Sequence, residues 1–163
     1  MLIKTILSLG SNRGHSQENI INCIKFLGKS KNIEIIKTSS MYKTSPMYNL
    51  SQNDFINCIV EARTSFPPLD LLEYNQSIEK SMGREVFIES NQPRKIDIDI
   101  LTYGDKEIED RNLKVPHPKI SDRKFVLVPL IEINPNFIVP GFSLNVSEML
   151  KKIEKNNDKV CII

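Results

Sequence analysis

The sequence predicts an α+β fold of the ferredoxin-like (split βαβ) type, an antiparallel sheet with helices packed on one face and a C-terminal extension. Three observations predict this class. The 163 residues suit a single domain, residues 1–163, that can bury a substantial core. The content of 40% hydrophobic and 26% charged residues is typical of a globular chain. The apolar patterns follow in the order strand, helix, strand, strand, helix, strand, which is the split βαβ order.

The N-terminal part contains the first expected strand and helix. Residues 2–9 form a short apolar run with polar insertions, which is typical of a strand. The glycine-bounded cluster at residues 10–14 predicts a turn, and Ser16 stands where it could cap a helix. Gly28 marks the expected end of that helix. The apolar residues at helical spacing between these limits are Ile20, Cys23, Ile24 and Leu27.

Two strands are expected next. Residues 33–42 are rich in Ile, Thr and Tyr and predict a strand, and a polar loop follows from Thr44 to about residue 53. Residues 54–64 alternate with period two, which brings the ring of Phe55 and the amide of Asn57 to the same, less apolar face. The apolar face carries Ile56, Cys58, Val60 and Ala62, and the other face carries Phe55, Asn57, Ile59, Glu61 and Arg63.

The second helix is expected between Pro67-Pro68, which suits a helix start, and Gly83, which suits an end. Gln76 and Glu79 lie three residues apart and are expected on its more polar side. A long polar connection at residues 84–95 follows. The expected buried stripe of the helix comprises Leu71, Leu72, Ile78 and Met82.

The last third begins with a strand at residues 96–101, followed by a hairpin turn at residues 103–106. Residues 113–118 contain too many prolines for regular structure. Mixed helical spacing at residues 121–133 and a short final helix at residues 145–153 make up the C-terminal extension.

The composition argues against several classes of protein. The three cysteines are odd in number and far apart, which disfavours a disulfide framework or a zinc knuckle and favours a cytoplasmic location. Cys23 and Cys58 stand among apolar neighbours and are expected in the core. No apolar run approaches the ~18 residues of a membrane span, so no membrane partner is expected. The net charge of +2 permits an anionic ligand but does not require nucleic acid.

Two acids in the expected strand at residues 96–101 are candidate metal ligands. Side chains two apart in a strand share a face, so Asp97 and Asp99 project together, roughly 6.6 Å apart along the chain. Their like charges repel unless a cation lies between them. Mg²⁺ prefers one or two carboxylates plus phosphate oxygens, and this pair predicts half of such a site. The alternative is a solvated strand face that carries two acids. Because so short a pattern often occurs without a metal site, the pattern on its own favours this alternative.

Arg84 and Arg94 bracket the polar connection that leads to these acids, and the chain has only six arginines. Arginine binds phosphate through a planar fork and stays charged at neutral pH. Two acids for metal and two arginines for phosphate are the parts that phosphoryl transfer needs. The alternative, two surface arginines on a loop, has about equal weight beside the acid pair.

Candidates for the remaining parts of a site lie in the flanking segments. His117, between two prolines, could donate to a phosphate oxygen or be a packed loop histidine. Phe55 and Asn57 could stack on and hydrogen-bond to a flat heterocycle, or be ordinary core and sheet-edge residues. Phe125 could add a second ring and Arg123 further positive charge, or they could belong to the core and to a solvated helix face.

These residues keep a characteristic order and spacing across about residues 9–130. The most specific part is the Arg-x-x-Asp-x-Asp core at residues 94–99, followed by Pro116-His117. The chain resembles the 6-hydroxymethyl-7,8-dihydropterin pyrophosphokinase family of folate biosynthesis. The matching stretches are Leu9-Gly10-Ser11-Asn12, Ser40 to Pro46, Asp54 to Asn57, Ile78-Glu79, Met82 to Arg84, Pro93 to Ile100, Val115 to Pro118 and Arg123 to Phe125.

The resemblance implies a ferredoxin-like fold and an ATP-dependent diphosphokinase. In such an enzyme ATP gives its β,γ-pyrophosphate to the hydroxymethyl oxygen of the reduced pterin by magnesium-assisted in-line transfer, and AMP leaves. The implied cofactors are two Mg²⁺ ions, with ATP as co-substrate. The implied partners are small molecules, ATP and 6-hydroxymethyl-7,8-dihydropterin, with no nucleic acid, and the chain is expected to act as a monomer.

The resemblance also implies roles for the matching residues. Asp97 and Asp99 would bind the metal ions and, with Arg84 and Arg94, form the catalytic set. The residues expected to contact ATP are Gln76, Glu79, Ile100, His117 and Arg123. The residues expected to contact the pterin are Thr44, Ser45, Met47, Phe55, Asn57 and Phe125, with the two rings on opposite sides of it.

Residues 84–95 are expected to close over the substrates as a lid that excludes water. Many members of the resembled family carry a tryptophan in this loop, whereas this chain has no tryptophan and Asn91 stands about there. Pro118 stands where some relatives have an aromatic residue.

Three rival interpretations fit the sequence less well. A nucleic-acid binder on the same fold predicts an aromatic-rich RNP1-type strand and a basic stripe, and neither is visible. A nucleotide-sugar transferase that binds its metal through Asp-x-Asp does not explain the Pro-Arg-x-x-Asp-x-Asp spacing. A degenerate relative that binds without reacting is disfavoured by the intact acids and arginines.

Overall fold

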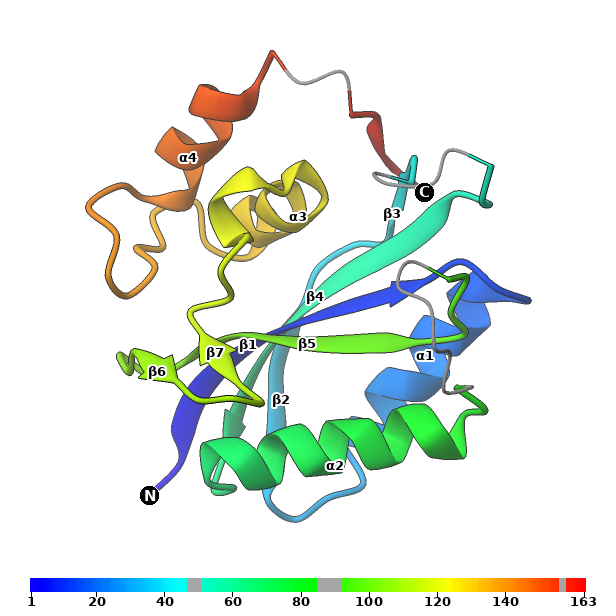
Figure 1. Cartoon of the computed structure of the whole chain (residues 1–163), viewed down its shortest axis with the longest axis vertical. Helices are drawn as coiled ribbons and strands as arrows, with labels where there is room; N and C mark the ends of the chain where they lie inside the picture. The colour runs from blue at the N-terminus through cyan, green and yellow to red at the C-terminus, as the bar shows by residue number, and fades with distance from the viewer. Residues whose placement is uncertain (47–50, 85–91, 156–157) are drawn as a thin grey trace.

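The structure is a computed structural model that describes residues 1–46, 51–84, 92–155 and 158–163 (Figure 1). Its main element is a six-stranded sheet in the order β5-β1-β4-β3-β8, with β2 also paired to β4, and β6 and β7 form a separate pair. The strands and helices are β1 (Ile3–Ser11), α1 (Ser16–Leu27), β2 (Ile33–Thr38), β3 (Tyr42–Thr44), β4 (Phe55–Thr64), α2 (Pro68–Ser81), β5 (Asp97–Tyr103), β6 (Ile108–Glu109), β7 (Lys114–Val115), the 3₁₀-helix η1 (Ile120–Asp122), α3 (Lys124–Ile133), α4 (Val146–Ile153) and β8 (Val160–Ile162).

The strand order confirms the predicted ferredoxin-like class. β1 lies between β5 and β4, β2 pairs with the other side of β4, and all these pairs are antiparallel. Helices α1 and α2 connect the strands as the split βαβ plan requires and lie on one face of the sheet (Figure 1). The main core fills the space between them, and Cys23 and Cys58 belong to it as predicted.

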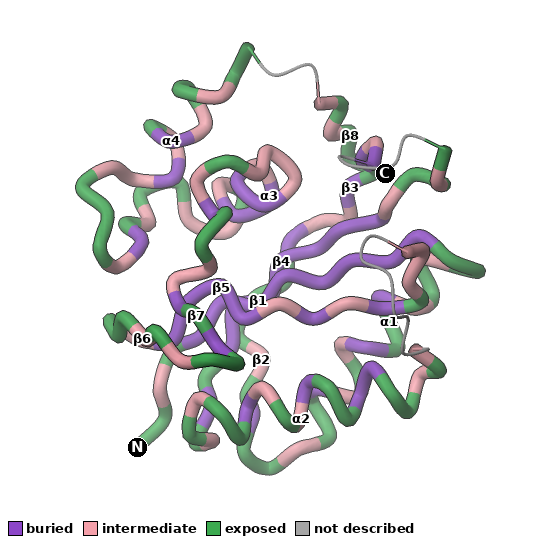
Figure 2. Tube along the Cα trace, viewed as in Figure 1, coloured by how far each residue is buried: buried purple, intermediate pink, exposed green. Residues whose placement is uncertain are grey.

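The opposite face is covered in part by the C-terminal extension. Helix α3 packs there on β4 and α4 packs on α3, and the two helices form a second core with Ile6, Ile59 and Leu101 (Figure 2). This face is therefore open to a ligand only in its uncovered part. The reason is that Ile6, Ile59 and Leu101 make this part of the face apolar, and burying them under α3 removes that surface from water. The polar side chains gather on the uncovered part.

The strand predicted at residues 33–42 is divided into β2 and β3, which pair with successive parts of β4. Ser39 lies at the division. Its backbone N–H donates to the carbonyl oxygen of Ile59 (2.9 Å), and its side-chain oxygen accepts from the N–H of Ile59 (2.9 Å). The serine hydroxyl thus takes the place of a backbone acceptor where the strand divides.

Several boundaries confirm or correct the sequence predictions. α2 begins at Pro68, as expected, and the final helix expected at residues 145–153 is α4, which begins at Val146 and is capped by the side chain of Asn145. Ser16 is not a cap, because α1 begins at that residue. Residues 103–106 form a turn, yet β5 makes no hairpin there, since β6 pairs with β7 instead. β7 interrupts the segment expected to be irregular, and β8, too short to give a periodic signal, pairs with β3.

Among the described residues no helix combines the length and the apolar character that a membrane crossing needs.

Candidate active site

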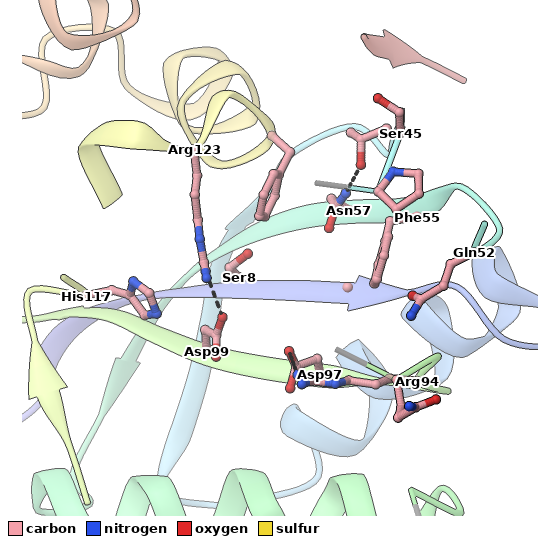
Figure 3. A pocket seen from close by; sticks show the side chains of 15 residues that line it. Ser8, Ser45, Gln52, Phe55, Asn57, Arg94, Asp97, Asp99, His117 and Arg123 are labelled. Carbon is pink, nitrogen blue, oxygen red and sulfur yellow. Dashed lines mark hydrogen bonds and ion pairs between the residues drawn. The ribbon is translucent and has the colours of Figure 1, made fainter. Parts of the chain in front are cut away.

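A pocket of about 220 Å³ opens on the uncovered part of the sheet face (Figure 3). Its floor is formed by β1, β4 and β5, and its sides by the segment after β3, the segments before β4 and β5, the loop after β7 and the start of α3. Most of the predicted site residues meet here. The predicted residues that line it are Thr44, Ser45, Phe55, Asn57, Arg94, Asp97, Asp99, His117, Arg123 and Phe125.

The two acids of β5 share the pocket face, as their spacing predicts. Ile98 and Ile100 point into the main core and are each 4% exposed. The side chains of Asp97 and Asp99 are 24% and 36% exposed and both line the pocket. The alternating pattern of β5 therefore separates a buried apolar side from a side that carries two carboxylates.

Three arginines contact these carboxylates. Nη1 of Arg84 lies 2.8 Å from Oδ1 of Asp97, and Nη1 of Arg94 lies 2.6 Å from Oδ2 of the same residue. Nη1 of Arg123 lies 3.4 Å from Oδ2 of Asp99. Each carboxylate thus already has a cationic partner, which reduces the repulsion between the two acids.

The carboxylates provide hard oxygen ligands of the kind that Mg²⁺ prefers. Over residues 1–46, 51–84, 92–155 and 158–163, no group of three or more His, Cys, Asp or Glu side chains is placed to bind a metal. A divalent cation at Asp97 and Asp99 would take its other ligands from water or from phosphate oxygens, which is the usual arrangement for Mg²⁺ at nucleotide sites.

Burial raises the pKa of Asp99 to about 6, and the charge of Asp97 acts in the same direction. The guanidinium groups of Arg123 and Arg94 oppose the shift. A cation between the two acids would favour the charged form of Asp99, because it replaces repulsion by attraction.

His117 is uncharged at neutral pH. Burial lowers its pKa to about 4, and the positive charges of Arg123 and Lys119 add to the effect. The backbone N–H of Lys119 donates to Nδ1 of the ring (3.1 Å), so the single proton of the neutral ring lies on Nε2. The backbone N–H of His117 donates to the carbonyl oxygen of Leu101 (2.9 Å), which fastens the loop to β5. The ring therefore offers a neutral N–H donor at the pocket wall.

Arg123 has unused hydrogen-bonding capacity. Its side chain is 16% exposed, and the guanidinium lies 5.5 Å from the centre of the Phe125 ring. Its buried Nε has no hydrogen-bond partner within the described part of the chain. Such orphaned donors are rare in folded proteins, and an oxygen of a bound ligand would satisfy this one.

The other end of the pocket combines an aromatic ring and an amide. Phe55 and Asn57 lie on the same face of β4, as the alternation predicts. Nδ2 of Asn57 donates to Oγ1 of Thr44 (2.6 Å), which fixes the orientation of the amide. Gly10 of β1 lies beside it, and a Cβ atom there would stand 3.1 Å from Oδ1 of Asn57. The amide can approach β1 this closely because residue 10 has no side chain.

Asn12 is a structural residue that the sequence predictions missed. Its N–H donates to the carbonyl oxygen of Arg94 (3.0 Å), and its side-chain oxygen accepts from the N–H of Arg94 (2.7 Å). Its amide nitrogen donates to the side-chain oxygen of Gln52 (3.0 Å). The buried asparagine thus joins the segments on both sides of the pocket. The sequence marked Asn12 only as part of a turn cluster and of a stretch that matches the resembled family, and neither reveals these contacts.

Ser8, Gly10, Gln52 and Gln92 also line the pocket and were not predicted as site residues. Only Ser8 carried a signal, as a polar residue within the apolar run of β1.

Glu79 lies elsewhere than predicted. It is 5% exposed and faces β5, so the expectation of a place on the polar side of α2 is wrong. Its Oε1 accepts from the N–H of Ile98 (2.7 Å), and Oε2 pairs with Arg84. Ile98 is distant in sequence and Arg84 lies beyond the end of α2. Their contacts with Glu79 offset the free-energy cost of burying its carboxylate. Glu79 therefore links α2, the base of β5 and the guanidinium that holds Asp97.

Some predicted site residues are not brought into the pocket. Gln76 is exposed on α2 and does not line the pocket, and Glu79 and Arg84 are not among the lining residues either. Ile100 has its side chain in the main core. Met47, Asn91 and most of the expected lid at residues 84–95 lie outside the described residues.

The environment of Glu79 predicts a pH effect on stability. Burial raises its pKa to about 7, and repulsion from Asp97 contributes, although the Ile98 N–H and Arg84 act in the opposite direction. An acid whose pKa is raised by folding binds its proton more tightly in the folded state. Its contribution to stability is complete below the ordinary pKa of 4.5 and is lost as the pH rises through about 7.

Glu79→Gln is therefore expected to reduce the fall in the free energy of unfolding between about pH 4.5 and pH 7, measured by urea unfolding at a series of pH values. Glu73→Gln on the exposed face of α2 is the matched control and should leave the profile unchanged. Parallel profiles for the wild type and Glu79→Gln would contradict the prediction.

The fold and the pocket together define a class of protein. Acids, arginines and a neutral histidine at one end, and an aromatic ring with a fixed amide at the other, suit an enzyme that transfers a phosphate-containing group to a flat heterocycle. Comparison with known families agrees. The family 7,8-dihydro-6-hydroxymethylpterin-pyrophosphokinase (HPPK) matches residues 6–135, and the chain belongs to this family of diphosphokinases.

Individual relatives agree with this assignment. The chain is 43% identical over 144 residues to the folic acid synthesis protein FOL1 of Dictyostelium discoideum, covering 88% of this chain and 21% of that protein. It is 33% identical to the 2-amino-4-hydroxy-6-hydroxymethyldihydropteridine pyrophosphokinase of Haemophilus influenzae, with 93% of both chains covered. The crystal structure of the HPPK-DHPS protein of Plasmodium falciparum has the same fold, with a TM-score of 0.76 at 18% identity over 98% of this chain and 46% of that one.

The chain thus spans about a fifth of the length of FOL1-type relatives and nearly all of the Haemophilus protein.

Proposed function

We propose that residues 1–163 form a pyrophosphokinase domain that transfers pyrophosphate from ATP to 6-hydroxymethyl-7,8-dihydropterin, in the synthesis of tetrahydrofolate. The products would be AMP and the pterin pyrophosphate. The observation that carries the proposal is the pairing, in one pocket, of two carboxylates held by arginines with a ring-and-amide surface. Family membership supports the reaction class.

The ring-and-amide end suits the pterin. Phe55 and Phe125 both line the pocket, and a flat heterocycle can stack on such rings. Asn57, with its amide fixed by Thr44, can read the donors and acceptors at the polar edge of the heterocycle. Ser45 lies beside them and extends the polar rim.

The charged end suits the triphosphate. Asp97 and Asp99 would bind magnesium, which neutralises phosphate charge when it is present. The arginines that now pair with these acids would then be free to bind phosphate oxygens, for which their planar forks are suited. His117 would add a neutral donor through Nε2.

The rate would come mainly from alignment and charge stabilisation, since the chemistry needs little covalent help. Arg84 and Arg94 would stabilise the charge on the transferring group; Arg94 lines the pocket, and both arginines contact Asp97, which also lines it. The backbone of Arg94 is held by Asn12, so its side chain starts from a fixed point.

The proposal is tested by whether ATP is converted to AMP or to ADP. The protein is mixed with ATP, magnesium and the hydroxymethyl pterin, and the nucleotides are separated by chromatography. AMP should appear in step with pterin pyrophosphate and only when the pterin is present. ADP in place of AMP would show ordinary kinase chemistry, and no pterin-dependent nucleotide product would refute the proposal.

Gly10→Ala is expected to raise the KM for the pterin by about tenfold and to leave the KM for ATP unchanged. The added methyl would displace Asn57, which is held by Thr44 and cannot retreat without losing that bond. Gly28→Ala, at the end of α1 and away from the pocket, is the matched control. An equal rise in both KM values would indicate general distortion of the sheet and contradict the specific effect.

A further inference from the structure

Ser8 is a polar residue within the apolar stretch of β1 that runs from Ile6 to Leu9, and the proposed function gives it no role. Its neighbours Leu7 and Leu9 point into the main core, and Ile6, two residues before it on the same face, is covered by α3. Ser8 is 6% exposed, and what remains accessible faces the pocket. Figure 3 shows its side chain rising from β1 on the side of Asp99 and Arg123.

The Ser8 hydroxyl makes no hydrogen bond within the part of the chain that the structure describes. A hydroxyl at the surface of a pocket is hydrogen-bonded by water when the pocket is empty, and a ligand that enters displaces that water. A hydroxyl that faces a pocket is satisfied when a ligand supplies the partner.

The position of Ser8 lies between the two ends of the pocket. β1 is the strand that separates β5, with the acids, from β4, with the ring and the amide. Ser8 is directly opposite Asp99 on one side and opposite Ile59 on the other. Gly10, the other β1 residue of the lining, has no side chain, so Ser8 provides the only polar side chain that β1 contributes to the described lining.

The acceptor must cross this strand. With the ring at β4 and the phosphate at β5, as in the proposed function, the exocyclic carbon and the hydroxymethyl oxygen would pass over β1. We propose that Ser8 is a further substrate-binding residue whose Oγ accepts a hydrogen bond from the hydroxyl group of the acceptor, leaving the oxygen lone pairs directed at phosphorus. This inference rests on the proposed function. It adds that the Ser8 hydroxyl makes the site selective for an acceptor with a primary alcohol.

A pair of ligands separates this contact from general effects on the pocket. Affinity is measured by calorimetry for 6-hydroxymethylpterin and for 6-methylpterin, which lacks the hydroxyl, in the presence of magnesium and a non-hydrolysable ATP analogue. Ser8→Ala should weaken binding of the hydroxymethyl compound by about 3- to 10-fold and leave that of the methyl compound unchanged. Ser8→Cys keeps the volume but is a poor hydrogen-bonding partner and should behave like Ser8→Ala.

The remaining outcomes overturn the inference. Equal weakening for both pterins would mean that Ser8 only shapes the pocket, and a selective loss of affinity for the ATP analogue would place the contact on the phosphate side. Unchanged affinity in both variants would show that the hydroxyl is not used. The exposed Ser77→Ala on α2 is the control for the measurement. If the wild type bound neither pterin and formed no AMP, the proposed function itself would fail, and this inference with it.

Discussion

Asp97→Asn and Asp99→Asn are each expected to lower turnover by on the order of 10³-fold while the fold is retained. The amide keeps the shape of the side chain but loses the charge that holds a divalent cation against the triphosphate. Both carboxylates line the pocket from the same side of β5, and among the described residues no third acid lines the pocket that could replace either of them. Turnover is measured as pterin-dependent AMP formation at saturating ATP and magnesium.

The control for these variants is Asp105→Asn, which removes a carboxylate from the exposed turn after β5. Its turnover should equal that of the wild type, and the thermal unfolding of all three variants should be cooperative. Turnover within a few fold of the wild type in either Asp97→Asn or Asp99→Asn would refute the assignment of that residue as a metal ligand.

Arg94→Ala is expected to lower kcat by about 10²- to 10³-fold with little change in the dissociation constant for ATP. The guanidinium pairs with Asp97 in the absence of ligand and would move to the transferring group, where its contact strengthens as charge develops. The backbone at this position stays fixed, because the contacts with Asn12 involve only main-chain atoms of residue 94. Arg94→Lys should recover little of the lost rate, since lysine lacks the planar fork.

Single-turnover kinetics and calorimetry with a non-hydrolysable ATP analogue separate these two quantities. The exposed Arg111→Ala, outside the pocket, controls for the loss of one positive charge from the chain. An Arg94→Ala variant with normal turnover and weakened ATP binding would show that the residue only anchors the substrate.

The parts of the fold and site that the sequence predicted are those that depend on local periodicity. Alternation in β4 placed Phe55 beside Asn57, and alternation in β5 placed Asp97 beside Asp99, because a strand sends every second side chain to one face. In each strand the alternating apolar residues determine which face is buried. The pairing of Phe55 with Asn57 and of Asp97 with Asp99 could therefore be predicted without knowledge of contacts distant in sequence.

The parts that could not be predicted depend on partners distant in sequence. Glu79 is buried because Arg84 and the Ile98 N–H meet it there, and helical spacing does not reveal those partners. Ser39 divides a strand because its hydroxyl meets Ile59 of β4. The C-terminal helices bury apolar residues on the second face of the sheet, such as Ile59. The pattern of a single strand does not show that another part of the chain will cover that face.

The claim on which the proposal depends is that the two β5 carboxylates exchange their arginine partners for divalent cations when the triphosphate binds. A crystal structure with Mn²⁺, a non-hydrolysable ATP analogue and the pterin tests it, with the cations located by their anomalous scattering. We expect two Mn²⁺ ions coordinated by Asp97, Asp99 and phosphate oxygens, with Arg84 and Arg94 turned to the phosphates. A complex in which both carboxylates still pair with the arginines and no cation lies between them and the triphosphate would contradict the proposed mechanism.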